Sequence, residues 1–420
     1  MAQRVSDHSL SAISGESVRQ NKQVLLALAF SGIVYSIWWR FDQPSYEDLN
    51  IYLDSVRAWS AGADLYEFRN ANGGGFTYPP FAAFLFLPLS RIPLELGSFG
   101  LIWGLLLLMV ASAGAYLLTR ARELSSWVLA LTVLVTLLGQ PMRDAVHFGQ
   151  ISPVVAFLVI GVPLLSGRGS AAWVGLAAAL KLMPAAQWGV WLVAGRLGQA
   201  LRSLAVFVAL GVAAWSVAPT ASENYWTHQL WNTGRVGDTA SLGNSSLLGL
   251  CARHFASVAP ILWVLSVAVV VGVMSCAVWG SRHLVHASEL LKLGYVLSLV
   301  VSPITWGHHA AFVPALALHC VVAAHASVAA RNLAVGSLVV WLVPIYDVAK
   351  WVDGLNHQAA LIVADLRTVS LLVIFALCSL GITAESRGLD GAGPGEATQR
   401  SRREPKISLG DHTPGAYHVD

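Results

Sequence analysis

Charged side chains are scarce in this sequence. Asp, Glu, Lys and Arg make up only 12% of the 420 residues, whereas 55% are hydrophobic and the mean hydropathy is +0.61. A soluble domain carries roughly a quarter charged residues, so this composition excludes an ordinary soluble protein. The apolar runs are continuous rather than alternating, which indicates membrane helices and not a β-barrel. The sequence therefore predicts an all-α polytopic membrane protein.

Cysteine and net charge are also low. Cys276, Cys320 and Cys378 lie inside apolar runs and Cys251 has no partner in a loop, so we expect no disulfide framework. A net charge of +3 is too small to indicate a nucleic-acid ligand. No Asp-x-Asp pair or group of His, Cys and carboxylates has metal-ligand spacing, so neither a metal nor another cofactor is expected.

Apolar segments recur along the chain without an evident internal repeat, which counts against a transporter built from inverted halves. The first segment, Val24 to Trp39, is followed by no small-residue cleavage site and is expected to be a retained anchor rather than a signal peptide. Eleven more segments bring the expected total to about twelve crossings, at residues 97–118, 124–138, 151–165, 170–181, 185–195, 203–218, 258–280, 289–304, 310–328, 332–346 and 363–382. Some are short, which predicts tilted or broken helices around a cavity.

Three regions follow from these segments. Residues 1–20 are expected to be a flexible cytoplasmic N-terminus, 21–383 a membrane catalytic domain, and 384–420 a disordered cytoplasmic tail rich in Gly, Arg, Glu and Pro. Within the membrane domain, 40–96 and 219–257 are expected on the extracytoplasmic face.

This orientation rests on the basic residues, which favour cytoplasmic loops. They fall on one side only if residues 79–93 form a re-entrant or interfacial segment and do not cross the membrane. The resulting localisation is the plasma membrane, with the acidic stretch from Glu47, the 139–150 loop and the Trp306-Gly307-His308-His309 turn together outside.

The stretch from Glu47 to Leu89 concentrates acidic and aromatic side chains in this apolar chain. Leu49, Tyr52 and Val56 recur at helical spacing, and Asp48 stands off their face. A carboxylate there could deprotonate a sugar hydroxyl as a general base. The alternative is a solvated acid in the first turn of a helix.

Lys181 is apolar on both sides, in Ala-Ala-Leu-Lys-Leu-Met-Pro. An ammonium in hydrocarbon is unfavourable unless it is paired or faces a wet cavity, so a functional site with an anionic phosphate is the default interpretation. The alternative is a lysine that extends to the interface.

Arg143, His308 and His309 are further candidates to bind a phosphate, because arginine pairs with it bidentately and imidazole can donate to it. Their alternatives are an arginine at head-group level and capping histidines. Contacts to a sugar or acceptor are expected from polar and aromatic residues of the same motifs, namely Tyr52, Tyr66, Tyr78, Gln150, Asn244 and Trp306.

Taken in order, these motifs resemble a known family. The series DLNIY, GADLY, FTYPPFAAFLFLPL, PMR with FGQIS, ALKLMPA, GNSS and SPITWGHH is similar to glycosyltransferase family 87. It is most like the actinobacterial polyprenol-phosphate-mannose-dependent α-1,2-mannosyltransferases of phosphatidylinositol mannoside synthesis. Ser152 and Met183 depart from the family's usual Asn and Thr, and the run Asn244 to Leu247 departs from its N-Q-S-W pattern.

The resemblance implies a C-type glycosyltransferase fold, an extracytoplasmic site, a polyprenyl-phosphate-mannose donor and a glycolipid acceptor. It places the catalytic base on Asp48 and donor contacts on Lys181, Arg143, His308 and His309. Converting a β-linked mannosyl phosphate into an α-1,2-linked product implies inversion by direct attack, with no second acid.

Alternatives within the family are transfer of arabinofuranose or a longer lipomannan acceptor. Outside it, a lipid-linked sugar flippase would need ionisable residues along a route through the membrane, and a silent scaffold would leave Lys181 unexplained.

Overall fold

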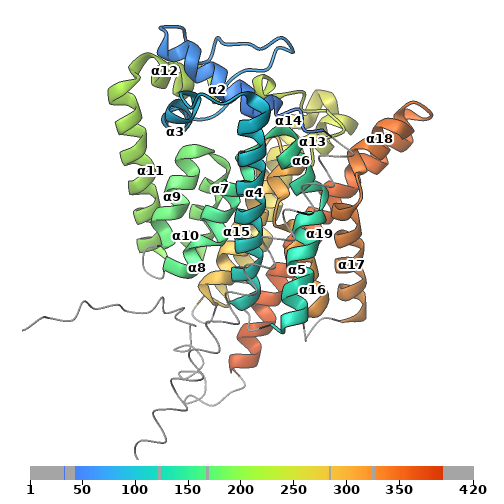
Figure 1. Cartoon of the computed structure of the whole chain (residues 1–420). Coiled ribbons are helices and arrows are strands. Elements are labelled where there is room, and N and C mark those ends of the chain that lie inside the picture. Colours follow the sequence, from blue (N-terminus) through green and yellow to red (C-terminus); the bar gives the residue numbers. More distant parts are fainter. Residues whose placement is uncertain are drawn as a thin grey trace, which may run out of the picture.

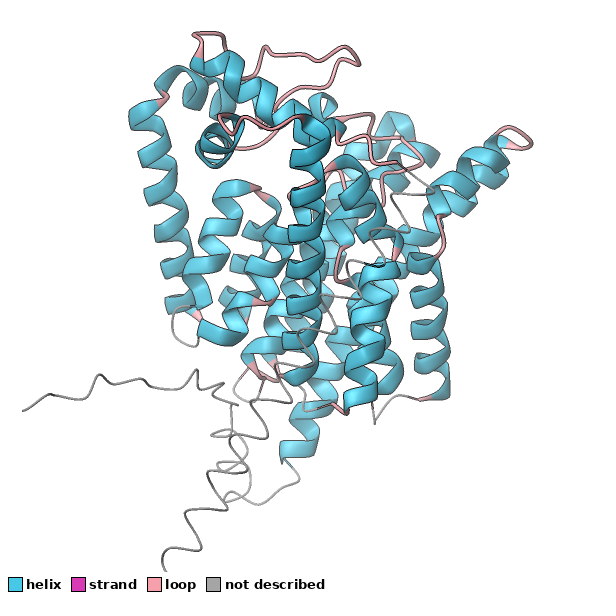
Figure 2. Cartoon of the chain, in the orientation of Figure 1, coloured by secondary structure: helices cyan, strands magenta, loops and turns pink. Residues whose placement is uncertain are grey.

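Helices dominate the architecture. The computed structural model describes residues 33, 43–121, 124–166, 170–282, 285–323 and 327–390, with side chains to 383 apart from Ser166, and these ranges contain no strand (Figure 2). The first helices are α2 (Glu47–Ser60), α3 (Pro80–Ser90), α4 (Leu96–Arg120), α5 (Ser126–Leu138), α6 (Gln140–Phe148), α7 (Ser152–Ile160), α8 (Val162–Ser166), α9 (Ser170–Leu180), η2 (Met183–Ala185) and α10 (Ala186–Val193). They are followed by α11 (Leu197–Val217), α12 (Pro219–Asn224), η3 (Tyr225–Gln229), η4 (Thr233–Val236), α13 (Leu247–His254), η5 (Ala256–Val258), α14 (Ala259–Trp279), α15 (Ala287–Val301), η6 (Gly307–Ala310), α16 (Val313–Val322), α17 (Val328–Leu342), α18 (Ile345–Asp353) and α19 (His357–Asp390).

Four helical segments are long and apolar enough to cross a membrane: Leu96–Arg120, Leu197–Val217, Ala256–Trp279 and His357–Thr383. Two bent pairs raise the number to six. α5 and α6 meet at 46°, and α17 and α18 meet at 74°. A span needs about 20 apolar residues, which these segments supply.

The expected count of about twelve crossings is not confirmed. Several expected crossings form short helices, including α7, α9 and α16, which have 9, 11 and 10 residues. Gly161 and Pro184 lie at breaks between such helices. Hydropathy alone cannot distinguish a full crossing from a half-length helix that is buried against its neighbours.

The centre of the bundle is α15. Every residue from Leu290 to Val300 in this helix is buried, so no face of it meets the surroundings. The buried Lys292 is paired with Glu289 at 2.7 Å, as a charge in a core requires. α10 and α19 pack directly against α15.

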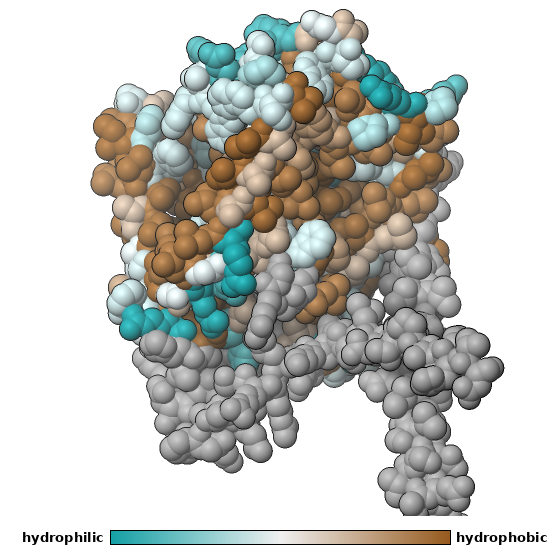
Figure 3. All heavy atoms as spheres, turned by 90° about the vertical axis from the view of Figure 1, so that its left-hand side faces the viewer, coloured by the Kyte–Doolittle hydropathy of each residue, from teal (hydrophilic) through white to brown (hydrophobic). Residues whose placement is uncertain are grey.

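The outside of the bundle is apolar. α11 exposes Leu197, Leu201, Val208 and Val212, and only 17% of its membrane-length window is buried. Figure 3 shows this side of the molecule, where hydrophobic side chains form a broad band below the hydrophilic end. Such a surface is suited to lipid contact.

α2, α3 and α12 lie together at one end of the bundle (Figure 1). α3 has 11 residues, a length of about 16 Å at the helical rise of about 1.5 Å per residue. It is therefore too short to cross a bilayer core of about 30 Å, as the interfacial interpretation of residues 79–93 requires. α3 packs against both α2 and α11.

Both predicted terminal regions fall largely outside the described residues. Residues 1–20 are not described, and Ile33 is the described residue of the predicted anchor at 24–39. α19 continues to Asp390, past the expected tail boundary at 384, and the remaining tail lies outside the described part.

Candidate active site

The backbone just before α2 fixes the position of Asp48 in the first turn of that helix. Tyr46, just before the helix, adopts a left-handed conformation with φ of 50°, and its backbone N–H donates to the carbonyl of His147 over 2.8 Å. This is an unfavourable conformation for a tyrosine, and it is held by the surrounding contacts. The first turn of α2 is thereby tied to the C-terminal end of α6.

Gly149 completes that junction. Its φ is +70°, and a Cβ at this position would lie 2.6 Å from the Cβ of Leu49. Only glycine combines this conformation with such a close approach. The carbonyl of Gly149 accepts a hydrogen bond of 3.0 Å from the Trp103 indole, which anchors the turn to α4. The glycine of the FGQIS motif therefore sets the distance between α2 and the following turn.

Gln150 links the carboxylate to two tyrosines. Its Nε2 donates to Oδ2 of Asp48, and its Oε1 accepts from the Tyr78 hydroxyl over 3.0 Å. The hydroxyls of Tyr78 and Tyr52 are 2.7 Å apart. Gln150, Tyr52 and Tyr78 are buried, so the amide is held in one orientation with its N–H toward Asp48.

Lys181 lies at the end of α9 and joins the same network. Its Nζ donates to the Ser152 hydroxyl over 3.0 Å and lies 2.8 Å from Nε2 of His309. Ser152 in turn contacts Gln150 at 3.4 Å. The ammonium also sits 5.1 Å from the centre of the Tyr78 ring. A continuous polar chain therefore connects Asp48 with Lys181, although the two are far apart in sequence.

The two histidines differ in their partners. Nδ1 of His309 accepts from the Trp306 backbone N–H over 3.3 Å while its Nε2 faces Lys181. Nε2 of His308 is buried and has no hydrogen-bond partner among the described residues. A buried polar atom without a partner is unfavourable, so His308 is the histidine that is available to a ligand.

Burial raises the pKa of Asp48 from 3.8 to about 6. The hydrogen bond from Gln150 and the charge of Lys181 oppose this rise, and Glu47 adds to it. A carboxylate with a pKa near 6 is ionised at neutral pH and is a stronger base than an exposed aspartate.

These groups surround a cavity of about 900 Å³, within the range of ligand sites. The predicted site residues that line it are Asp48, Tyr52, Tyr78, Arg143, Gln150, Lys181, Trp306, His308 and His309. In the described ranges, no three His, Cys, Asp or Glu side chains are grouped as metal ligands.

Two predicted sugar contacts lie outside the lining. The Tyr66 side chain is buried and donates to the Tyr78 carbonyl over 2.9 Å. Asn244 is fully buried, and its amide makes four hydrogen bonds: it donates to the carbonyls of Thr239 and Pro303 and accepts from the backbone N–H groups of Ser246 and Thr305. Both residues support the cavity wall, and their polar atoms are engaged in hydrogen bonds within the protein.

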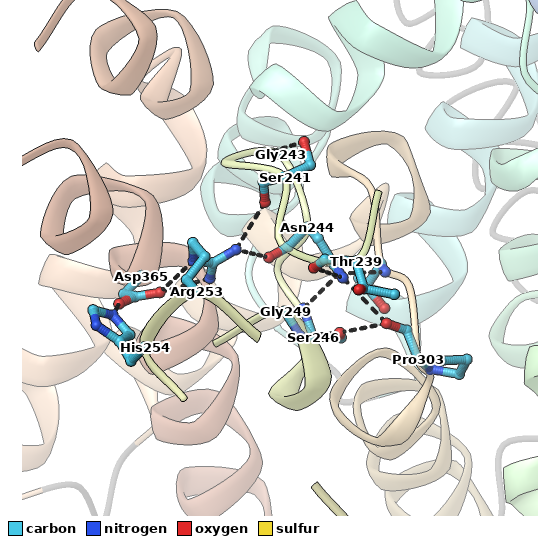
Figure 4. A network of polar contacts seen from close by, with 11 residues as sticks. Thr239, Ser241, Gly243, Asn244, Ser246, Gly249, Arg253, His254, Pro303 and Asp365 are labelled. Atoms are coloured by element: carbon cyan, nitrogen blue, oxygen red, sulfur yellow. Dashed lines mark hydrogen bonds and ion pairs between the residues drawn. The ribbon is translucent and has the colours of Figure 1, made fainter. Parts of the chain in front are cut away.

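The Asn244 loop is clamped to α19. Arg253 donates to the carbonyls of Ser241 and Asn244, and its guanidinium pairs with Asp365 at 2.6 Å (Figure 4). His254 reaches the other oxygen of the same carboxylate. The Arg253 side chain is buried and Asp365 is half-buried, so the loss of either partner would leave a poorly solvated charge. The ion pair fixes the loop that carries Gly243 to the cavity.

Asp144, Arg235 and Arg367 also line the cavity but are not among the predicted site residues. Arg367 interrupts an apolar helix, the same signal that identified Lys181, and it could have been found in that way. Arg235 donates to the Thr77 carbonyl over 2.8 Å and stacks over Tyr225. Asp144 follows Arg143 directly, and nothing in the sequence distinguishes it from a solvated acid.

The arrangement supports two kinds of chemistry. Asp48, whose pKa is about 6, can accept a proton at one side of the cavity. Lys181 and the unpartnered His308 can hold a negative charge at the other. The remaining wall near Lys181, formed by Leu182, Met183 and Ala186, is apolar.

Comparison with known proteins gives a consistent result. Residues 76–303 match the model of glycosyltransferase family 87. A polyprenol-phosphate-mannose-dependent alpha-(1-2)-phosphatidylinositol mannoside mannosyltransferase of Mycolicibacterium smegmatis is 30% identical over 68% of this chain and 72% of its own length. The protein of the same description from Mycobacterium tuberculosis is 31% identical over 68% and 73%. A phosphatidylinositol pentamannoside mannosyltransferase of M. smegmatis is 28% identical over 66% and 70%. No solved structure matches the chain.

Proposed function

This chain belongs to glycosyltransferase family 87, and we propose that it transfers mannose from polyprenyl-phosphate-mannose to a hydroxyl of a phosphatidylinositol mannoside, forming an α-1,2 linkage. The donor, the sugar and the linkage are those that the names of its relatives state. Mannose is preferred to arabinofuranose for that reason. The chain is a membrane enzyme, with four helical segments long and apolar enough to cross a bilayer.

Asp48 is the proposed base. Its carboxylate accepts the proton of the acceptor hydroxyl, the hydroxyl oxygen forms a bond to the anomeric carbon, and the bond from that carbon to the phosphate oxygen breaks. The phosphate leaves with the electron pair. One displacement at the anomeric carbon gives inversion. A second acid, which glycosidases use to protonate the leaving oxygen, is unnecessary here because the leaving group is a phosphate whose charge the protein can stabilise.

Lys181, Arg143 and His308 are the proposed phosphate partners. A phosphate that is held by cations and N–H donors leaves without being protonated first. Lys181 is oriented for this role by Ser152 and His309. We assign the prenyl chain to the apolar wall of Leu182, Met183, Ala186 and Trp263, which continues from the lysine.

The end of the bundle with α2 and α12 is proposed to be the extracytoplasmic one, in the plasma membrane. The charge bias of the loops supports this orientation. A lipid-linked donor and a lipid-anchored acceptor can then meet at the membrane surface, in the cavity that residues of α2, η4 and α18 help to line.

The observation that carries the proposal is the polar chain from Asp48 through Gln150 and Ser152 to Lys181. Replacement of Asp48 by Asn tests it. We expect mannosyl transfer in membranes supplied with polyprenyl-phosphate-mannose to fall about a hundredfold or more, because general-base catalysis contributes about 10² to 10⁴. Donor binding should persist. An Asp48→Asn protein that transfers mannose at the normal rate would remove Asp48 as the base.

A further inference from the structure

One side of the cavity is not used by the chemistry described above. It extends from Gly307, beside His308, to the exposed residues Tyr346 and Asp347 of α18. Asp144, Arg367 and Trp306 line it between these ends. We call these five residues, Asp144, Trp306, Tyr346, Asp347 and Arg367, the α18 arm.

Arg367 is the unusual member of the arm. Only 2% of the Arg367 surface is exposed, and yet its Nε and Nη2 atoms have no hydrogen-bond partner in the described ranges. The guanidinium lies 5.4 Å from the centre of the Trp341 ring, which holds its plane. Buried guanidinium N–H groups are normally satisfied. Two of these donors are therefore available to a bound molecule.

Asp144 lies beside Arg367. A Cβ on Gly307 would lie 2.4 Å from Oδ2 of Asp144 and 3.1 Å from Nη1 of Arg367, so both groups meet the same point of the backbone. Oδ1 of Asp144 accepts from Gln140 over 2.6 Å, which fixes the carboxylate. The glycine of the Trp-Gly-His-His turn thus leaves room for an acceptor and a donor side by side.

The charge of the arm selects the kind of ligand. Two carboxylates, Asp144 and Asp347, act electrostatically on the one guanidinium of Arg367. Arg143 also acts on Asp144, but its effect is smaller than that of Arg367. A second anion would be repelled by the carboxylates, whereas neighbouring hydroxyl groups can donate to a carboxylate and accept from a guanidinium at once. A neutral polyol therefore fits better than a phosphate.

Aromatic rings complete the arm. The Trp306 ring would lie 3.2 Å from a Cβ on Gly243, and Tyr346 3.5 Å from the same point. Indole and phenol rings combine an apolar face with a polar edge, a surface that is suited to a sugar ring. α18 projects from the bundle (Figure 1), and Tyr346 and Asp347 at the outer end of the arm are exposed.

We propose that the α18 arm binds the mannose residues of the acceptor that lie beyond the reacting one, and so determines which glycolipid is extended. This inference rests on the proposed function, because it takes the acceptor to be a mannoside. Arg367 and Asp144 hold the hydroxyls of one sugar, and Trp306 and Tyr346 contact its ring. They are binding residues and take no part in proton transfer.

The test uses the full-length protein with two substitutions that keep side-chain size, Asp144→Asn and Arg367→Lys. The apparent KM for a phosphatidylinositol mannoside acceptor should rise about tenfold or more, as expected for the loss of a charge-assisted hydrogen bond, while the KM for polyprenyl-phosphate-mannose is unchanged. Arg331→Gln, which changes an exposed arginine of α17, is the matched control and should alter neither constant.

A binding measurement separates this inference from the proposed function. Saturation-transfer NMR with soluble α-linked mannotriose, in an Asp48→Asn background, should detect binding that Arg367→Lys weakens. If the native protein binds mannotriose through the arm but transfers no mannose, the proposed function fails and the arm stands. If it transfers mannose and both arm variants keep the native acceptor KM, the arm is wrong. No mannotriose signal, together with binding of inorganic phosphate that Arg367→Lys weakens, would also overturn it, because the arm would then bind anions.

Discussion

At the scale of single residues, the site depends on which hydrogen-bond partner each polar side chain has. Asp48 keeps one oxygen engaged with Gln150, and burial holds its pKa near 6. Gln150 can serve in this way because its own carbonyl is fixed by Tyr78. Two adjacent histidines likewise have different tasks, since only His309 faces Lys181.

The pKa of Asp48 predicts a pH profile. The base is active as the carboxylate, so kcat/KM should increase with pH up to about pH 7 and should fall about tenfold per pH unit below pH 6. Because the folded pKa is raised above 3.8, ionisation of Asp48 lowers stability as pH increases through this range. Asp48→Asn should therefore melt at a temperature no lower than the native protein at pH 8. A rate that is flat down to pH 4.5 would contradict this role.

The histidine pair predicts two different phenotypes. His308→Ala should raise the KM for the donor about tenfold, through loss of a hydrogen bond to a charged group. His309→Leu should also weaken donor use, because it removes the partner that orients Lys181. His309→Gln keeps an acceptor and should recover most of the loss. Equal defects in the Leu and Gln variants would show that His309 does not act through Lys181.

At the scale of helices, the site depends on the junction between α2 and the turn after α6. Tyr46 and Gly149 both have positive φ there, and the backbone of α2 is tied to α6 by the bond from Tyr46 to His147. Neither helix is a candidate span on its own. Their contact, rather than the position of either in the membrane, holds Asp48 against Gln150.

Gly149→Ala tests this junction. The new Cβ meets Leu49, the neighbour of Asp48, so we expect kcat to fall about tenfold or more, since small misplacements of a base are costly. Gly195→Ala is the matched control. Gly195 has a φ of +69° but no atom within 4 Å of the added methyl, so it bears only the backbone cost of about 1 kcal/mol. The two variants can be compared by their transfer rates and their melting temperatures. Equal transfer rates in the two would show that the spacing does not matter.

At the scale of the whole molecule, the cavity exists because distant segments converge at one end of the bundle. α2, α6, η2, η6, α18 and α19 all contribute residues to it, as does Lys181 just after α9. The outside of α11 and α14 is apolar, with only 17% of each membrane-length window buried. A lipid-facing surface and a polar cavity are therefore kept apart by the core around α15.

The orientation of this bundle can be measured by labelling. The test uses a protein whose four cysteines are replaced by Ser and into which one cysteine is introduced, by Trp231→Cys or by Arg331→Cys. Residue 231 comes after α12 in the chain, whereas residue 331 is at the start of α17, which begins at the opposite end of the bundle (Figure 1). Both positions are exposed. A membrane-impermeant maleimide should label residue 231 in intact cells and residue 331 only after permeabilisation. The reverse pattern would place the cavity on the cytoplasmic side.

Local sequence patterns were sufficient to predict the class of protein, its family and the presence of a polar cavity. The scarcity of charge fixed the class of protein, and the motifs identified the family that the comparisons confirm. The embedded Lys181 indicated a polar cavity, because an ammonium in an apolar run is unfavourable unless a partner or a wet cavity stabilises its charge. The matched family segment, residues 76–303, nevertheless contains neither Asp48 nor His308.

The amino-acid sequence by itself determined the class of protein, its family and nine of the residues that line the cavity, because those follow from composition and from short motifs. Only the tertiary structure decided that Asn244 and Tyr66 support the wall, that His308 is the available histidine, and that Arg367 belongs to the cavity. The physical reason is that hydrogen-bond partners lie across helices: whether a polar side chain is free for a ligand depends on neighbours that are up to a hundred or more residues away.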